Sequence, residues 1–81
     1  MKLWYSRHFL RQYAAAPVYV QRAFLKQIHL LLQNLHHPSL RAKEYHESLG
    51  IWQARVTRDW RLYFSLQGDE CRLHEITPHP K

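Results

Sequence analysis

The sequence contains one cysteine, two glycines and no long apolar run among its 81 residues. Because Cys71 has no second cysteine to pair with, an internal disulfide is excluded, and small domains without disulfides are typical of a reducing cytoplasm. The N-terminal stretch MKLWYSRHFLRQ meets charge too early for a secretory signal, and no segment reaches the roughly 20 apolar residues of a transmembrane helix. We therefore expect a soluble, cytoplasmic protein without membrane association.

Acidic residues are absent from the first half of the chain, where the first one is Glu44. Seven Lys or Arg residues precede Glu44, whereas from Glu44 onward there are five Lys or Arg residues and six acidic ones, and the net charge is +6. Solubility alone does not require this asymmetry. The distribution favours a polyanionic partner, either nucleic acid or an acidic protein segment, over basic residues that only solvate the helices.

Motifs that mark several other classes of function are also missing. There is no glycine-rich phosphate loop and no nucleophile elbow. His36, His37 and His46 have no cysteine or carboxylate at a familiar metal-ligand spacing. We therefore expect no metal site and no cofactor. Cys71 lies among apolar neighbours in a strand pattern, which is typical of a buried small hydrophobe.

The first half of the chain predicts a strand followed by a helical hairpin. Residues 2–5 form an apolar, aromatic run typical of a strand, and Ser6 can cap the helix that follows. The sequence AAAP ends this helix, and Pro17 suits the first turn of a second one. Both helices carry an apolar face that must pack on another layer, formed by Phe9, Leu10 and Tyr13 in the first and by Val20, Phe24, Ile28, Leu31 and Leu35 in the second.

The second half predicts a meander of strands after a long connection. Residues 34–50 have no clean period and contain a proline and a glycine, so we predict a connecting segment, a feature that is often functional in small domains. From Trp52 to Thr77 apolar and polar residues alternate, which predicts three strands joined by short turns. The even-numbered apolar residues of the first two strands would face the helices.

The turn between the first two strands of this meander decides which residues face each other. A two-residue loop would set Val56 opposite Arg61 and mix the two faces of the sheet. We therefore expect a three-residue loop over 58–60, which sets Arg55 opposite Tyr63. For the next turn, two residues at Gly68 and Asp69 would pair Phe64 with Leu73 and Tyr63 with His74. The fold class is thus predicted to be α+β, a single domain over 1–81 in the order β-α-α-β-β-β, with about four mainly antiparallel strands and both helices on one face.

One face of the predicted sheet gathers Arg55, Arg61, Tyr63 and His74, and the closing stretch LHEITPHPK brings His79 to its end. Guanidinium groups bind phosphate oxygens in bidentate fashion and stabilise charge that develops on them. A histidine can take or give a proton near neutral pH, and an RNA substrate supplies its own 2′-hydroxyl as nucleophile. The prolines on either side of His79 would hold it in place, whereas a solvated tail is the alternative interpretation.

These residues resemble the RelE/ParE superfamily of toxins from bacterial type II toxin–antitoxin pairs. The resemblance covers nearly the whole chain and is strongest in HPSLRAKEY, in GIWQARVTRDWRLYF and in ITPHPK. It implies a toxin that is silenced by the acidic C-terminal segment of a cognate antitoxin, to which the basic helix residues would bind. In the RelE-like branch it also implies a ribosome-dependent endonuclease that cleaves mRNA on the ribosome.

Carried over to this sequence, the resemblance assigns Arg55 and Arg61 to the scissile phosphate, His79 to proton transfer and Tyr63 to orientation or stacking. The second proton-transfer group would come from the loop, where the candidates are Lys43, Glu44, His46 and Glu47. Further RNA contacts are expected from Arg41, Lys43, Arg58, Arg72 and His74.

The sequence departs from the pattern at its end, since several relatives carry an aromatic residue beside the histidine, whereas Pro80 and Lys81 follow here. Two alternatives share the fold: a ParE-like, non-enzymatic inhibitor of DNA gyrase and a binding module that has lost activity. His79 and Arg61 favour the nuclease.

Overall fold

The computed structural model describes residues 1–79, which form a single sheet with two helices. The strands are β1 (Lys2–Tyr5), β2 (Lys43–His46), β3 (Ile51–Thr57), β4 (Trp60–Gln67) and β5 (Glu70–Pro78). The α-helices are α1 (Arg7–Ala15) and α2 (Val18–Gln33), and two short 3-10 helices, η1 (Pro38–Leu40) and η2 (Glu47–Leu49), flank β2. Among residues 1–79, no helix is long and apolar enough to cross a membrane.

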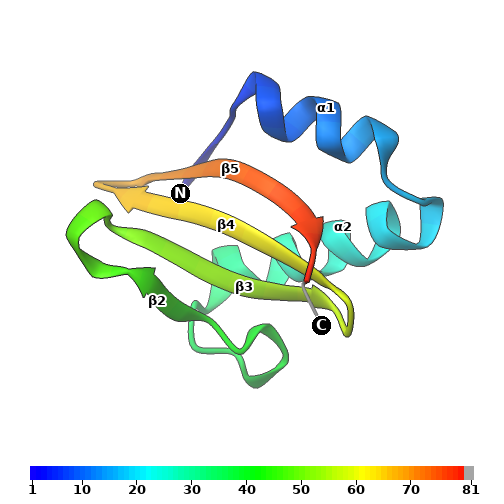
Figure 1. The fold of residues 1–81 in the computed structure, drawn as a ribbon. Coiled ribbons are helices and arrows are strands. Elements are labelled where there is room, and N and C mark those ends of the chain that lie inside the picture. Colours follow the sequence, from blue (N-terminus) through cyan, green and yellow to red (C-terminus); the bar gives the residue numbers. More distant parts are fainter. Residues whose placement is uncertain (80–81) are drawn as a thin grey trace.

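The sheet has the strand order β1-β5-β4-β3-β2, in which β1 runs parallel to β5 and every other pair is antiparallel (Figure 1). The predicted α+β class, the chain order and the mainly antiparallel sheet are confirmed. The strand count was one too low, because the segment predicted as a connection contains β2. All four residues of β2 are exposed, so it has no apolar alternation from which it could be recognised.

Both helices begin as the sequence predicts. The Oγ atom of Ser6 accepts a hydrogen bond from the backbone N–H of Phe9 at 2.9 Å and donates one to the backbone oxygen of His74 at 3.0 Å. Ser6 therefore caps α1 and also fastens it to β5. Pro17 immediately precedes α2, where its missing N–H is not needed.

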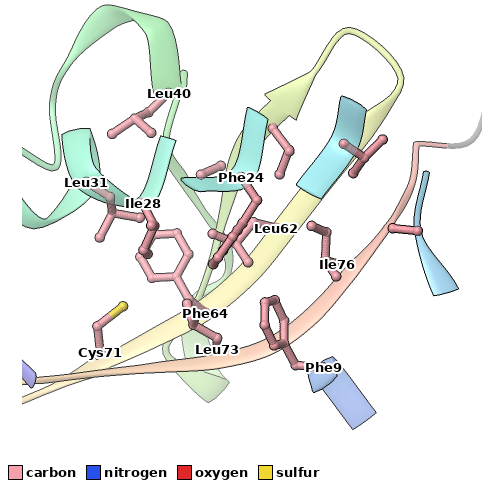
Figure 2. Packing of buried hydrophobic residues seen from close by; sticks show 14 residues of the cluster. Phe9, Phe24, Ile28, Leu31, Leu40, Leu62, Phe64, Cys71, Leu73 and Ile76 are labelled. Atoms are coloured by element: carbon pink, nitrogen blue, oxygen red, sulfur yellow. The ribbon is translucent and has the colours of Figure 1, made fainter. Parts of the chain in front are cut away.

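The hydrophobic core lies between the helices and one face of the sheet (Figure 2). Phe9 of α1 contacts Phe24 of α2 with ring centroids 5.3 Å apart, above Phe64 and Leu73, which are fully buried. One prediction for this face was wrong, because Leu10 is 50% exposed. Leu35 packs against the core as predicted, but from a position beyond the end of α2. The nine-residue α1 packs mainly on β5, and Phe9 is its buried residue. The large side chains that are fully buried include Phe9, Val20, Leu40, Leu62, Phe64, Cys71, Leu73 and Ile76.

Two β-bulges change the predicted register while keeping the predicted faces. The β3–β4 turn has two central residues rather than three, because Thr57 pairs with Trp60, and Val56 is the extra residue of a bulge. Arg55 therefore lies opposite Arg61 and not opposite Tyr63. The bulge absorbs the mismatch that a two-residue turn would otherwise create between the faces.

The second bulge lies on β5. Phe64 pairs with Leu73 as predicted, but Tyr63 pairs with Glu75 and not with His74, which is the extra residue. Beyond this bulge Arg61 pairs with Thr77, so the end of β5 is carried to the β3–β4 turn.

Candidate functional site

A cleft of about 280 Å³ lies where the open face of the sheet meets the segment after β5. We call it the sheet cleft. Its lining residues come from five parts of the chain and are polar without exception: Arg41, Lys43, Gln53, Arg55, Arg61 and His79. The antiparallel pairing explains how they meet, since Lys43 lies opposite Gln53 and Arg55 lies opposite Arg61.

Arg61 combines a structural with an electrostatic role. Its Nη1 atom donates hydrogen bonds to the backbone oxygens of Thr57, Arg58 and Trp60 at 2.9, 3.1 and 3.0 Å, so the side chain closes the β3–β4 turn. Burial and the neighbouring Arg55 guanidinium lower the pKa of Arg61 from its ordinary value. The turn thus fixes the guanidinium of Arg61 beside a second positive charge. An anion bound between the two would relieve this repulsion.

His79 is fastened to the same turn through its backbone. Its N–H donates a hydrogen bond of 2.6 Å to the backbone oxygen of Asp59, and the preceding Pro78 pairs with Trp60. His79 is exposed and lines the sheet cleft. The sequence predicted that two prolines hold this histidine; Pro78 belongs to β5, whereas Pro80 lies outside the described residues. The hydrogen bond to Asp59 was not foreseen.

Arg41 is held in a strained backbone conformation. With φ 46° and ψ 42° it occupies the left-handed region, which non-glycine residues seldom adopt. Among residues 1–79, Arg41 alone combines a positive φ with a side chain larger than that of glycine. It ends η1, and its side chain is exposed toward the sheet cleft. Strain of this kind costs on the order of 1 kcal/mol or more and persists where the surrounding structure enforces it, often at functional sites.

Several other predicted site residues lie outside the sheet cleft. Tyr63 and His46 line a separate pocket of about 400 Å³ on the open face, as does His74. Glu44, Glu47 and Arg58 line neither cavity and are exposed. Of the four proposed proton-transfer residues in the loop, only Lys43 therefore lines the sheet cleft.

Arg72 and His74 are engaged in other contacts. The Nε atom of Arg72 bonds the Oε1 atom of Glu70 at 2.6 Å, and its guanidinium lies 5.5 Å from the ring centroid of Trp4 near the β1 edge. The Nε2 atom of His74 lies 2.8 Å from Ser65 Oγ. Burial and the nearby Arg72 lower the pKa of His74, which favours its neutral form.

Gln53 is a site residue that the sequence reasoning missed. Its side chain is 7% exposed, lines the sheet cleft and donates a hydrogen bond of 2.9 Å from Nε2 to the hydroxyl of Tyr63. It thereby links the sheet cleft to the ring of Tyr63, which packs edge-on against Tyr45 with centroids 5.1 Å apart. Its position two residues before Arg55 on the same strand face was a signal that could have identified it.

The lining chemistry of the sheet cleft suits an anion. It offers three guanidinium groups, one ammonium group and one imidazole, and no carboxylate is among its lining residues. Within residues 1–79, the ion pairs are His8–Glu75 and Arg72–Glu70, so neither engages a cation of this cleft. The described residues contain no group of three or more His, Cys, Asp or Glu that could hold a metal ion. Cys71 is buried as predicted, and burial raises its pKa to about 11, which leaves its thiol unreactive.

The fold is similar to that of several solved structures. A YoeB/ParE toxin from Agrobacterium tumefaciens superposes with a TM-score of 0.83 at 14% identity, over 99% of this chain and 100% of that chain. A chain of the archaeal RelE–RelB complex from Pyrococcus horikoshii gives a TM-score of 0.81 at 13% identity, over 99% and 96% of the two chains. A chain of the YoeB–YefM complex from Staphylococcus aureus gives 0.79 at 12% identity, over 99% and 98%.

These likenesses extend over the whole described chain, so it has the fold of the RelE/ParE toxins. The sequence matches no protein-family model and no curated protein. The structures from P. horikoshii and S. aureus are complexes in which the matched protein is bound to a second protein. The S. aureus structure is a toxin–antitoxin complex.

Proposed function

We propose that this chain is the toxin of a toxin–antitoxin pair and that it cleaves mRNA on the ribosome. The observation that carries the proposal is the sheet cleft, in which five cationic or titratable nitrogen side chains converge without a carboxylate on the fold of RelE/ParE toxins. Such a cleft favours a phosphodiester, because guanidinium groups bind its oxygens and stabilise the additional charge of a phosphorane-like transition state. A gyrase inhibitor that performs no chemistry does not need this convergence.

In the proposed reaction the RNA 2′-hydroxyl attacks the adjacent phosphorus, and the bond from phosphorus to the 5′-oxygen of the next nucleotide breaks. The products are a 2′,3′-cyclic phosphate and a free 5′-hydroxyl. Arg55 and Arg61 lie opposite each other and would bind the non-bridging oxygens. His79 would protonate the departing 5′-oxygen, since its imidazole is exposed at the mouth of the cleft. Because the substrate supplies the nucleophile, the scheme needs no metal.

Lys43 is the proposed partner of His79 in proton transfer. It lines the sheet cleft on β2, whereas the other three loop candidates do not. In this scheme the Lys43 side chain would remove the 2′-proton as the hydroxyl attacks phosphorus. Gln53 and Tyr63, linked by their hydrogen bond, would orient the nucleotide beside the phosphate.

The antitoxin would bind the helical surface. A groove of about 220 Å³ between α1 and α2 is lined by apolar and aromatic residues, among them Leu10 and Leu25, which are 50% and 59% exposed. The same two helices carry the exposed basic residues Arg7, Arg11, Arg22 and Lys26. An acidic segment with apolar anchors matches both features, and its affinity should fall steeply with salt. Binding that does not depend on salt would assign the affinity to the apolar groove alone.

Expression of the protein without a partner tests the proposal. We expect growth arrest in which incorporation of labelled amino acids collapses before DNA synthesis does, with new 5′-hydroxyl ends inside the coding regions of mRNA. DNA synthesis that stops first, together with gyrase-linked DNA breaks, would instead support the gyrase inhibitor. Arrest without either change would contradict both activities.

A further inference from the structure

A second, larger cleft of about 490 Å³ lies at the open edge of β3, beyond the last residue that pairs with β2. We call it the edge cleft. It lies between α2, η1 and the end of β3, and its lining residues are Ala23, Lys26, Gln27, Pro38, Ser39, Arg41, Arg55 and Val56. Arg41 and Arg55 line both clefts, so the two clefts are adjacent.

The walls of the edge cleft are joined by one buried polar side chain. Gln27 is 5% exposed, and its Nε2 atom donates to the backbone oxygens of Arg55 at 2.7 Å and Ser39 at 3.2 Å. Its Oε1 atom accepts a hydrogen bond from the hydroxyl of Ser39 at 3.2 Å. Both amide hydrogens are thus directed into the protein, and α2, η1 and β3 are held in a fixed arrangement. Gln27 therefore shapes the edge cleft and leaves ligand binding to its cationic neighbours.

The remaining charged groups of the edge cleft are all positive. Lys26 contributes an ammonium group from α2, and Arg41 and Arg55 contribute guanidinium groups, whereas no lining residue is acidic. Within residues 1–79, none of the three forms a side-chain hydrogen bond or an ion pair. The strained backbone of Arg41 places its side chain at the junction of the two clefts. A single phosphate in the sheet cleft would leave Lys26 without a partner.

We propose that the edge cleft is a second phosphate subsite, in which Lys26 and Arg41 bind a backbone phosphate of the same RNA strand next to the one that is cleaved. The inference rests on the proposed RNA substrate. A nucleic acid strand carries one negative charge per nucleotide, so a strand whose scissile phosphate lies at Arg55 and Arg61 must place neighbouring phosphates close by. Because Arg41 and Arg55 line both clefts, the edge cleft lies next to that position. The second subsite would fix the direction of the RNA strand and hold it in place during the reaction.

Equilibrium binding separates this role from general electrostatic attraction. The probe is a short, fluorescently labelled single strand with 2′-O-methyl groups throughout, which cannot be cleaved. Lys26→Gln should weaken binding roughly tenfold and reduce the slope of log affinity against log salt by about one. The matched control is Arg22→Gln, which removes one charge from the exposed surface of α2 outside the edge cleft. If both variants weaken binding equally, or if the salt slope of Lys26→Gln is unchanged, the subsite is wrong.

Replacing single phosphates by neutral methylphosphonates locates the contact. With the wild-type protein, one position adjacent to the scissile linkage should weaken binding roughly tenfold, and in Lys26→Gln the same replacement should have no further effect. Additive losses at every position would contradict the subsite. A poly-glutamate peptide tests the other class of polyanion: if Lys26→Gln weakens its binding and leaves RNA binding unchanged, the edge cleft serves an acidic protein segment.

The outcomes distinguish this inference from the proposed function. Lys26-dependent RNA binding combined with intact ribosome-bound mRNA would retain the subsite and overturn the endonuclease. Cleavage of ribosome-bound mRNA that is equally fast in Lys26→Gln and in the wild type at limiting protein would overturn the subsite and retain the endonuclease.

Discussion

On the helix-covered face of the sheet, Leu62 and Phe64 are 1% and 0% exposed and belong to a single apolar cluster. On the open face, by contrast, Arg55 of β3 and Arg61 and Tyr63 of β4 remain partly exposed. Strand alternation makes this contrast possible, because neighbours in sequence point to opposite faces. The covered face contains the contacts that hold the fold together. The open face concentrates like charges, and burial together with the neighbouring Arg55 guanidinium lowers the pKa of Arg61.

The cations of the open face repel one another, and the core on the opposite face of the same strands supplies the stability that keeps them together. Residues of the covered face should therefore control the free energy of unfolding, and residues of the open face should control activity.

The largest effect on stability is expected from the sequence neighbours Phe64 and Tyr63. Phe64→Ala should lower the free energy of unfolding by about 3–5 kcal/mol, because it empties the centre of the core. Tyr63→Ala should cost about 1–2 kcal/mol, since it loses the edge-on contact with Tyr45 and the hydrogen bond from Gln53. Urea denaturation of both variants is the measurement. Equal losses would show that the open face is part of the core.

Arg61 and Arg55 should separate activity from stability although they lie opposite each other. Both Arg55→Gln and Arg61→Gln should slow the cleavage step by roughly 10²–10³-fold, the range found when a transition-state donor is removed. Only Arg61→Gln should also lower the free energy of unfolding, by about 1–2 kcal/mol, because its Nη1 atom bonds three backbone oxygens of the turn. Single-turnover rates and thermal melting measured on the same preparations test this. Two variants with identical melting temperatures would remove the structural role of Arg61.

Arg41→Gly tests whether backbone strain is maintained for function. Glycine adopts positive φ without a steric penalty, so the free energy of unfolding should stay constant or rise by up to about 1 kcal/mol, while RNA affinity falls roughly tenfold. Arg41→Lys keeps the charge and should retain most of the affinity, which makes it the matched control. A clear loss of stability in Arg41→Gly would mean that the side chain of Arg41 supports the fold.

The smallest effect concerns the pH dependence of stability. Because burial and Arg72 lower the pKa of His74 in the folded state, the unfolded chain binds its proton first as the pH falls below about 6.5. Stability should therefore decline from that pH downward and level off below the folded-state pKa. In His74→Gln this part of the decline should be absent, and melting temperatures across the range provide the comparison. A decline of the same size in both proteins would assign it to other histidines.

Much of the fold could be predicted because local signals agreed with one another. The cap at Ser6, the apolar stripe of α2 and the alternation of β3 and β4 each specify one element, and each element is present. The registers could not be predicted fully, because a bulge at Val56 or His74 depends on tertiary packing and leaves no distinct pattern in the sequence.

The candidate site was predictable where it lies on regular strands, whereas in the loop the sequence named candidates without choosing among them. Arg55 and Arg61 share a face by alternation alone. The positions of Arg41 and Lys43 depend on the left-handed residue after η1 and on the edge strand β2, and neither has a sequence signal. The role of Gln27 could not be predicted, because its partners on η1 and β3 are distant in sequence.

The most direct test of the proposed reaction is single-turnover cleavage of ribosome-bound mRNA across about pH 5.5 to about pH 9. The wild type and His79→Ala are compared on two messages, one with ribose throughout and one with a single 2′-deoxy nucleotide at the cleavage site. We expect the deoxy substitution to abolish cleavage there, the ribose product to end in a 2′,3′-cyclic phosphate, and His79→Ala to lower the rate by roughly 10²–10⁴-fold with an altered pH profile. His36→Ala, which changes an exposed histidine outside the sheet cleft, should leave rate and profile unchanged. Cleavage of the deoxy message, or a pH profile that is the same in His79→Ala and in the wild type, would contradict the account.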